Sequence, residues 1–197
     1  MALTGDLIDG TPDALKDDIE PLGELRARYG VFGVTGNHEY YFQVRNWLPV
    51  FEKLGVTMLH NEHKTLSVDG RTDLVIAGIP DPTGTRFGGP GPDAHKALYG
   101  APDALRLLLA HRPDGASGND HADIQLSGHT HGGLLFFLKW LLASFNGGLV
   151  QGLYDVKGTT LYVSPGTGLW SGFSCRLGVP SEITRIVLRA PDKQPQF

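Results

Sequence analysis

The chain has 197 residues, of which 41% are hydrophobic and 19% are charged, as is typical of one globular domain. Its net charge of -4 and the lack of a polybasic segment argue against a nonspecific nucleic-acid-binding protein. A single cysteine excludes an intrachain disulfide framework. Residues 1–4 do not resemble a signal peptide, and the longest apolar run, residues 134–145, is too short to span a bilayer. We therefore expect a cytoplasmic or membrane-associated protein.

Helices and strands alternate in the first part of the chain. Apolar residues at helical spacing follow a Thr-Pro pair, which is typical of a helix start, and short runs rich in Val, Ile and Phe indicate buried strands. The predicted elements are a helix interrupted at Pro21 (11–29), a strand (30–35), a helix (44–54), two strands (56–59 and 64–68) and a buried strand (73–79).

Strands dominate the second part of the chain, so the whole pattern predicts a layered α/β domain over residues 1–189 and a polar tail at 190–197. A core helix at 134–145 is favoured over a lipid-facing rim. The further predicted elements are a Gly/Pro loop (80–92), a short helix, strands at 105–110 and 124–126, and strands at 161–163 and 183–188.

Two histidines, His129 and His131, lie in the glycine-rich stretch 126–133, just after a predicted strand. Neutral imidazole is the commonest protein metal ligand, and glycines allow the backbone to turn sharply there. Taken alone, the stretch fits a solvated polar turn about as well as a metal site.

Three other apolar runs also end in loops that hold metal-type ligands. Because the carboxyl ends of parallel strands meet at one edge of a sheet, these side chains are expected to converge. Carboxylate, amide and imidazole donors without a thiolate suit Mn, Fe or Zn, and their number is enough for two ions. The residues are Asp6 and Asp9; Asn37, His38 and Glu39; and His111.

Each of these residues also has a structural interpretation. Asp6 and Asp9 fit a turn or a helix cap, the Asn37-His38 pair fits a plain turn, and His111 fits a hydrogen-bonded histidine at a strand end. Asp6, Asn37 and His111, taken together in this order with His129 and His131, favour the metal site. The remaining histidines, which lack this glycine-loop context, are expected on the solvated surface: His60, His63, His95 and His121.

The segments Gly5-Asp6-Leu7-Ile8-Asp9, Gly36-Asn37-His38-Glu39, His111 and Gly128-His129-Thr130-His131 resemble, in order and spacing, motifs two to five of the calcineurin-like metallophosphoesterases. Segments 78–82, 110–114 and 164–168 are similar to the bacterial subgroup that is often membrane-anchored. The resemblance covers nearly the whole chain. It implies an α/β/β/α sandwich, two divalent metal ions, and hydrolysis of phosphate esters through a metal-activated hydroxide.

The resemblance also implies a role for each residue. Asp6 would bridge the two metals, and His131 would bind the first. His38 would face the substrate and protonate the leaving oxygen or stabilise phosphoryl charge. The second metal would be bound by Asn37, His111 and His129, while Asp9 and Glu39 would orient ligands through hydrogen bonds.

The family's first motif, an Asp-x-His at the end of the first strand, would precede Asp6, where the chain has five residues. Asp93-Ala94-His95 has the right letters but lies between motifs three and four. We therefore expect a sandwich that is truncated at its N-terminus and lacks its first strand, with Asp6 and His131 left for the first metal. Either one or two ions would then be bound.

Two function classes follow. The first is a metal-dependent phosphoric ester hydrolase that acts on phosphomonoesters, phosphodiesters or pyrophosphates, with a small-molecule or lipid-linked substrate. The second is a weakly active or inactive chain with a residual metal- or partner-binding site. A mononuclear hydrolase is a third and weaker alternative, because one ion cannot contact both the attacking and the leaving oxygen. Membrane association would run through residues upstream of the printed sequence.

Overall fold

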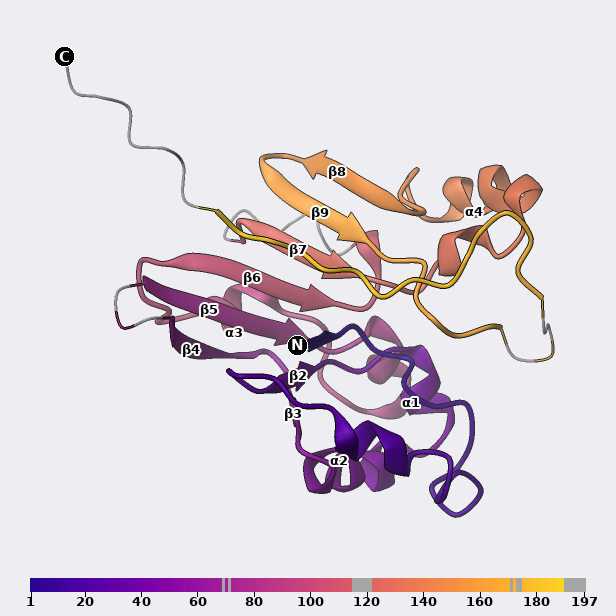
Figure 1. Ribbon diagram of the computed structural model, residues 1–197, viewed down its shortest axis with the longest axis horizontal. Coiled ribbons are helices and arrows are strands. Elements are labelled where there is room, and N and C mark those ends of the chain that lie inside the picture. The colour runs from indigo at the N-terminus through magenta and orange to yellow at the C-terminus, as the bar shows by residue number, and fades with distance from the viewer. Residues whose placement is uncertain (69, 71, 115–121, 171, 173–174, 190–197) are drawn as a thin grey trace.

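A computed structural model describes residues 1–68, 70, 72–114, 122–170, 172 and 175–189 (Figure 1). Two sheets face each other, one with strand order β1-β2-β3 and the other with order β4-β5-β6-β7-β9-β8. The smaller sheet is parallel, and in the larger sheet β5, β6, β7 and β9 are parallel while β4 and β8 pair antiparallel at its ends. The strands are β1 (Ala2–Leu3), β2 (Val31–Gly33), β3 (Val56–Met58), β4 (Glu62–Val68), β5 (Thr72–Ile79), β6 (Leu105–Ala110), β7 (Ile124–Ser127), β8 (Gly152–Val156) and β9 (Thr159–Val163).

The helices are short, and four of the eight in the described ranges are 3-10 turns. None of the helices in the described ranges is both long enough and apolar enough to cross a bilayer. They are η1 (Glu20–Glu24), α1 (Asn37–Tyr41), α2 (Val44–Lys53), η2 (Pro82–Phe87), α3 (Ala94–Leu98), η4 (His131–Gly133), η5 (Phe136–Leu138) and α4 (Lys139–Phe145).

Alternation along the strands builds the layers, because successive side chains of a strand point to opposite faces of its sheet. In β2, Phe32 packs between the sheets with Ile76 and Leu109, whereas Val31 packs outward beneath α2. The outer face of the large sheet, which includes Val75, is covered by α3. The result is an α/β/β/α sandwich, as expected from the sequence, with α2 and α3 on its outer faces (Figure 1).

The helix predicted over residues 11–29 is wrong for most of its length. Only the five-residue turn η1 forms, with Pro21 in its first turn. Proline has no N–H to donate and limits the helix before it, so the apolar residues here fold as a loop instead. Leu15, Ile19 and Leu22 are still partly buried against the cluster that contains Trp47. The helical spacing therefore marked the residues that face the core but not their backbone conformation.

The strand predicted at 183–188 is also absent, and β8 was not predicted. Ile183 is 91% exposed, and residues 183–188 pair with no strand in the described ranges. A strand needs a partner edge for its backbone groups, and an alternating apolar pattern does not supply one. β8, in contrast, forms a hairpin with β9 through the turn at Lys157 and Gly158, which both have positive φ. The predicted tail at 190–197 lies outside the described residues.

Candidate metal centre

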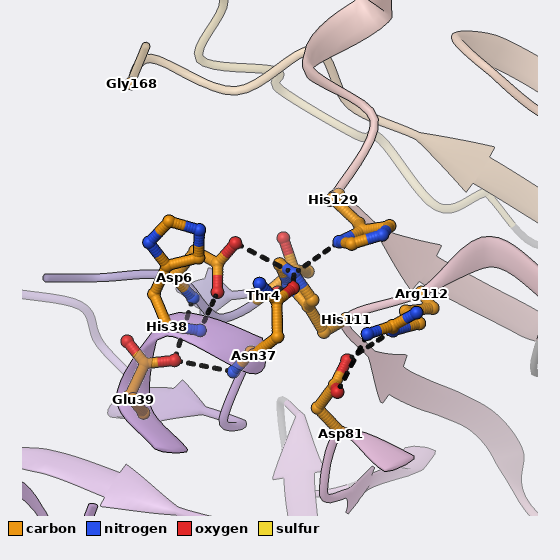
Figure 2. Close-up of polar contacts among 12 residues, drawn as sticks. Thr4, Asp6, Asn37, His38, Glu39, Asp81, His111, Arg112, His129 and Gly168 are labelled. Atoms are coloured by element: carbon orange, nitrogen blue, oxygen red, sulfur yellow. Dashed lines mark hydrogen bonds and ion pairs between the residues drawn. The ribbon is translucent and has the colours of Figure 1, made fainter. Parts of the chain in front are cut away.

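The candidate ligands all follow the carboxyl ends of parallel strands, which is where open α/β sheets place their sites. Asp6 follows β1, Asn37 is the first residue of α1 after β2, and His111 directly follows β6. His129 lies two residues beyond β7. Figure 2 shows the side chains of Asp6, Asn37 and His129 gathered around that of His111. Four loops that are far apart in the sequence therefore meet at one point.

The ring nitrogen Nε2 of His111 is the centre of this group. It lies 3.0 Å from Oδ2 of Asp6, 3.2 Å from Oδ1 of Asn37 and 3.1 Å from Nδ1 of His129. One donor atom each of Asp6, His111 and His129 can be chosen so that all three lie within 4.8 Å of one another. This separation matches donor atoms that share one ion, since metal–ligand bonds to N and O are about 2.0–2.2 Å long.

The tautomer of His111 tests whether these residues fit a metal. Its Nδ1 lies 2.6 Å from the carbonyl oxygen of Thr4, and a carbonyl can only accept, so Nδ1 carries the hydrogen. In the neutral ring Nε2 then has a lone pair, which faces oxygen atoms of Asp6 and Asn37. This approach of acceptors is repulsive unless a cation lies between them, either a proton on Nε2 or a metal ion, whereas Nδ1 of His129 can face Nε2 as donor or acceptor according to its tautomer. The donor set fits a borderline divalent ion.

The electrostatics hold two of the donors in their metal-binding protonation states. Burial alone would raise the pKa of Asp6, but the hydrogen bond and charge of His111 and the backbone amide of His38 lower it to about 2. Burial, with the charges of His111 and Arg112, lowers the pKa of His129 to about 3. Asp6 is therefore an anion and His129 a neutral base at neutral pH.

Two glycines allow the loops to come this close. A Cβ on Gly36 would collide with the Asp6 carboxylate and would lie 2.6 Å from the Asp6 backbone nitrogen. Gly5 has a φ of +88°, and a Cβ there would lie 2.5 Å from the nitrogen of Gly36 and 2.8 Å from Nδ1 of His111. The glycine before each acidic or amide ligand is thus needed for space as well as for turning.

Three of the candidate ligands have a strained backbone. Asp6, His129 and His131 have φ values of 52°, 69° and 50°, in the left-handed region that non-glycine residues rarely adopt. Such conformations cost about 1–3 kcal/mol each and persist where the surrounding structure enforces them. Thr130 supplies part of that enforcement, because its Oγ1 donates to the carbonyl of Val150 at 2.6 Å.

Glu39 is fully buried and fixes the backbone around Asp6. Its carboxylate accepts hydrogen bonds from the backbone N–H groups of Asp6 (3.0 Å), Leu7 (2.6 Å) and Gly36 (2.6 Å). Burial and the nearby charge of Asp6 raise the pKa of Glu39, while those backbone donors act in the opposite direction. Glu39 thus ties the loop after β1 to the start of α1, consistent with a ligand-orienting rather than a ligand position.

His38 is turned away from the donor group around His111 and pairs with Asp9. Nδ1 of His38 lies 2.8 Å from Oδ1 of Asp9, while the backbone N–H of His38 donates to Oδ1 of Asp6 at 2.9 Å. The His38 side chain is 24% exposed. One residue therefore contacts the Asp6 carboxylate through its main chain and presents its imidazole to solvent beside it.

His131 lies outside the group formed by Asp6, His111 and His129. Its Nδ1 is 3.3 Å from the carbonyl oxygen of Gly168, and its ring stacks edge-on against Trp170. Among the described residues, the group of mutually close ligand atoms contains Asp6, His111 and His129 but not His131. Burial lowers the pKa of His131, so its ring is neutral at pH 7. The structure therefore gathers four of the five predicted ligands.

Arg112 and Asp81 adjoin this group and were not among the predicted site residues. Nε of Arg112 donates to Oδ2 of the fully buried Asp81 at 2.9 Å, and its Nη2 donates to Oγ1 of Thr83 at 3.0 Å. The signal was present, because Arg112 directly follows His111 and Asp81 ends the loop after β5. The sequence thus places an arginine beside a predicted metal ligand and an aspartate at a neighbouring strand end. This pattern indicates a positive charge that an ion pair holds in a fixed orientation.

Other histidines differ in their surroundings from the prediction of a solvated surface. His95 is exposed, but His60 and His63 are half-buried. Burial lowers the pKa of His60, and Nδ1 of His63 lies 2.7 Å from the carbonyl of Ala97. Both lie at or beside β4, and His63 can be half-buried there at little cost because one of its ring nitrogens is hydrogen-bonded. His121 lies outside the described residues.

Asp93 caps α3, because its side chain accepts a hydrogen bond from the backbone N–H of Lys96. This agrees with its exclusion as a ligand from the family's first motif.

Comparisons with known proteins give one consistent result. The chain is 41% identical to a Bos taurus transmembrane protein with metallophosphoesterase domain, over 95% of this chain and 45% of that protein. It is 37% identical to a Campylobacter jejuni metallophosphoesterase over 96% of this chain and 50% of that one. It is 31% identical to an Aquifex aeolicus metallophosphoesterase over 96% of this chain and 72% of that one. No protein-family profile matches the chain.

The chain spans about half the length of most of these relatives, but it covers 72% of the Aquifex aeolicus protein at 31% identity. The aligned region includes nearly all of the present sequence, and with it the four loops that meet at His111. The chain therefore belongs to the metallophosphoesterases.

Proposed function

We propose that this chain is the metal-binding domain of a phosphoesterase that hydrolyses phosphomonoester, phosphodiester or pyrophosphate bonds. The observation that carries the proposal is the convergence of Asp6, Asn37 and His129 on the lone pair of His111 Nε2. Family membership supplies the reaction class, and this arrangement supplies a place for a divalent ion. We propose Mn, Fe or Zn, since the donors are oxygen and imidazole nitrogen without a thiolate.

The residues that would hold the ion are Asp6, Asn37, His111 and His129, and a second ion would be held by Asp6 and His131. When bound, divalent ions supply Lewis acidity, which lowers the pKa of a bound water and offsets phosphoryl charge. Asp6 can serve both ions because its carboxylate has two oxygens. The Thr4 carbonyl keeps the His111 hydrogen on Nδ1 and so leaves Nε2 available.

We assign His38 the proton transfer to the leaving oxygen. Because Nδ1 of His38 pairs with the Asp9 carboxylate, the proton that it gives up is the one on Nε2. The contact with the Asp9 carboxylate fixes the orientation of the ring. The departing alkoxide needs this proton most when it is a strong base, so the role predicts a dependence on the leaving group.

Arg112 would contribute the charge that binds a non-transferred phosphoryl oxygen. Asp81 and Thr83 fix its guanidinium through Nε and Nη2, whereas Nη1 donates to none of the described residues. Its side chain is 30% exposed, and its positive charge acts on His129. A pre-oriented arginine of this kind suits a phosphate group, whether the ester is a small molecule or linked to a lipid.

The test is hydrolysis of phenyl phosphate and p-nitrophenyl phosphate by the Mn-loaded chain and by His38→Gln. For His38→Gln we expect kcat on phenyl phosphate to fall by about 10²–10⁴-fold with unchanged metal content, and to fall much less on p-nitrophenyl phosphate, whose leaving group needs no proton. His63→Gln, a half-buried histidine far from the centre, should match the parent chain.

Equal losses on the two esters would contradict proton donation by His38. A chain that binds Mn but hydrolyses neither ester, nor bis(p-nitrophenyl) phosphate nor pyrophosphate, would contradict the enzyme proposal and identify the alternative of an inactive metal-binding chain.

A further inference from the structure

The segment that follows η4 exposes a cluster of large apolar side chains, which we call the aromatic surface. Trp140 is 84% exposed, and Phe145 is 76% exposed. In Figure 1, α4 lies at the margin of the molecule, away from the two sheets. The aromatic surface consists of Phe136, Phe137, Trp140, Leu141, Phe145 and Leu177, each more than half exposed.

These side chains are not the ones that attach the segment to the protein. Leu134 is fully buried, and Leu138 and Leu142 are half-buried on the inner side of the segment. The outer row repeats at four-residue spacing through Phe137, Leu141 and Phe145. A helix on a protein surface ordinarily turns polar residues outward, so this outer row is apolar without a folding reason.

Charge around the aromatic surface is positive, although the chain as a whole carries a net charge of -4. Residues 124–154 contain no aspartate or glutamate, and Lys139, which is exposed, lies at the start of α4. Arg176, beside Leu177, donates to the main-chain carbonyls of Pro165 and Gly168 and forms no ion pair with a described carboxylate. Lys139 and Arg176 therefore place positive charge beside the apolar cluster, and residues 124–154 add no acidic side chain to it.

We infer that the aromatic surface docks the protein onto an anionic lipid bilayer, with α4 lying in the interface. Tryptophan and phenylalanine favour the headgroup boundary, and a basic residue beside them adds attraction to anionic lipid. A seven-residue helix lies in that plane and does not cross it. A second copy of this chain fits less well, because residues 124–154 of that copy would bring no acidic side chain to pair with Lys139.

Docking in this way would place the candidate metal centre near lipid headgroups. The loop after β7 carries His129 and His131 and continues directly into η5 and α4. This inference does not depend on the proposed function, since binding to vesicles requires neither a metal ion nor hydrolysis.

The experiment is co-sedimentation of the full chain with vesicles of phosphatidylcholine alone or mixed with phosphatidylglycerol, together with tryptophan fluorescence. We expect binding that rises with phosphatidylglycerol and a blue shift from Trp140, the most exposed of the three tryptophans, since Trp47 is fully buried already and Trp170 is half-buried. Trp140→Ser should weaken binding by at least about tenfold, and Lys139→Gln by about fivefold on the anionic vesicles only.

Tyr99→Ser is the matched control, because Tyr99 is 79% exposed at the end of α3, outside the aromatic surface. Trp140→Phe should retain binding and lose the blue shift. Because Trp140 and Tyr99 are exposed, neither serine variant should change the thermal midpoint appreciably. The inference is overturned if no vesicle binds, if the two serine variants behave alike, or if Trp140→Ser instead abolishes a concentration-dependent dimer seen without lipid.

Discussion

The loop that follows β7 has two parts with opposite character. Residues 128–134 bury polar groups, since Thr130 is 2% exposed and His129 is half-buried against His111. Residues 136–145 expose apolar ones, with Trp140 the most exposed. Both parts depart from the usual distribution of polar and apolar side chains, in opposite directions and within one short stretch. Folding alone favours neither departure, so each indicates a place where the chain contacts something other than itself.

The two parts should also differ in what a substitution does. In residues 128–134 the strained backbone is enforced by hydrogen bonds and by close neighbours, so a change there alters the donor geometry. In residues 136–145 the outer side chains have few neighbours, so a change there should leave the fold and the metal centre intact. The predictions below test the polar part, from the largest expected effect to the smallest.

Gly36→Ala should have the largest effect. Its Cβ would collide with the Asp6 carboxylate, so the loop after β1 must move away from His111. We expect Mn affinity to fall at least about a hundredfold, because even the loss of a residue that only orients a ligand costs 10–100-fold. The measurement is isothermal titration of the metal-free chain with Mn.

Gly23→Ala is the control for an added methyl group, since the atom that it meets most closely is the flexible Cδ2 of Leu54. If Gly36→Ala does not fold, Glu39→Gln tests the same loop. It keeps the shape of Glu39 but loses the charge that holds the amides of Asp6, Leu7 and Gly36, and it should weaken Mn binding by about 10–100-fold. Parental affinity in Glu39→Gln would contradict the positioning of Asp6 by Glu39.

The pH dependence of stability should change sign when metal is added. Burial would lower the pKa of His111, but its hydrogen bond and ion pair with Asp6 outweigh this and raise it above 6.5. The metal-free fold therefore gains stability that is fully present below pH 6.5 and is lost as pH rises through the raised value. With metal, the proton on Nε2 must leave, so stability should instead rise over the same range.

Denaturant unfolding with chelator and with Mn, between about pH 6 and 9, measures both slopes, each at most about 1.4 kcal/mol per pH unit for one proton. Asp6 adds little there, because its pKa is about 2. His129, whose pKa is lowered to about 3, adds a slope of the opposite sign below about pH 7, where unfolded histidine is still partly protonated, so the two conditions are compared above about pH 7. If the free energy of unfolding changes with pH in the same direction with chelator and with Mn, the proton and the metal do not share Nε2 of His111.

Much of the fold could be predicted from the sequence, because apolar runs and their periods determine which residues are buried. β2, α2, β5, β6 and β7 formed where those patterns are strongest. Residues 11–29 failed because the helical spacing of Leu15, Ile19 and Leu22 did not account for Pro21. Residues 183–188 failed because strand pairing depends on a partner edge, which a local pattern does not specify.

The candidate site was predictable for a different reason. Asp6, Asn37, His111 and His129 each follow an apolar run, and the sheet edge brings such positions together. Three features could not be predicted, because they depend on distances between loops. They are the space that Gly36 leaves for Asp6, the pairing of Arg112 with Asp81, and the position of His131 outside the donor group around His111. The outward row on α4 was hidden because an apolar run does not reveal which of its faces is covered.

Elemental analysis of the folded chain after dialysis against Mn tests the central claim most directly, when the parent is compared with His129→Ala and His131→Ala. The account predicts a tightly held equivalent that is lost in His129→Ala and kept in His131→Ala, because His129 lies in the donor group around His111. A second equivalent of Mn that is lost in His131→Ala would show that a second ion is bound through His131. No bound metal in the parent, or an equivalent that survives in His129→Ala, would contradict the account.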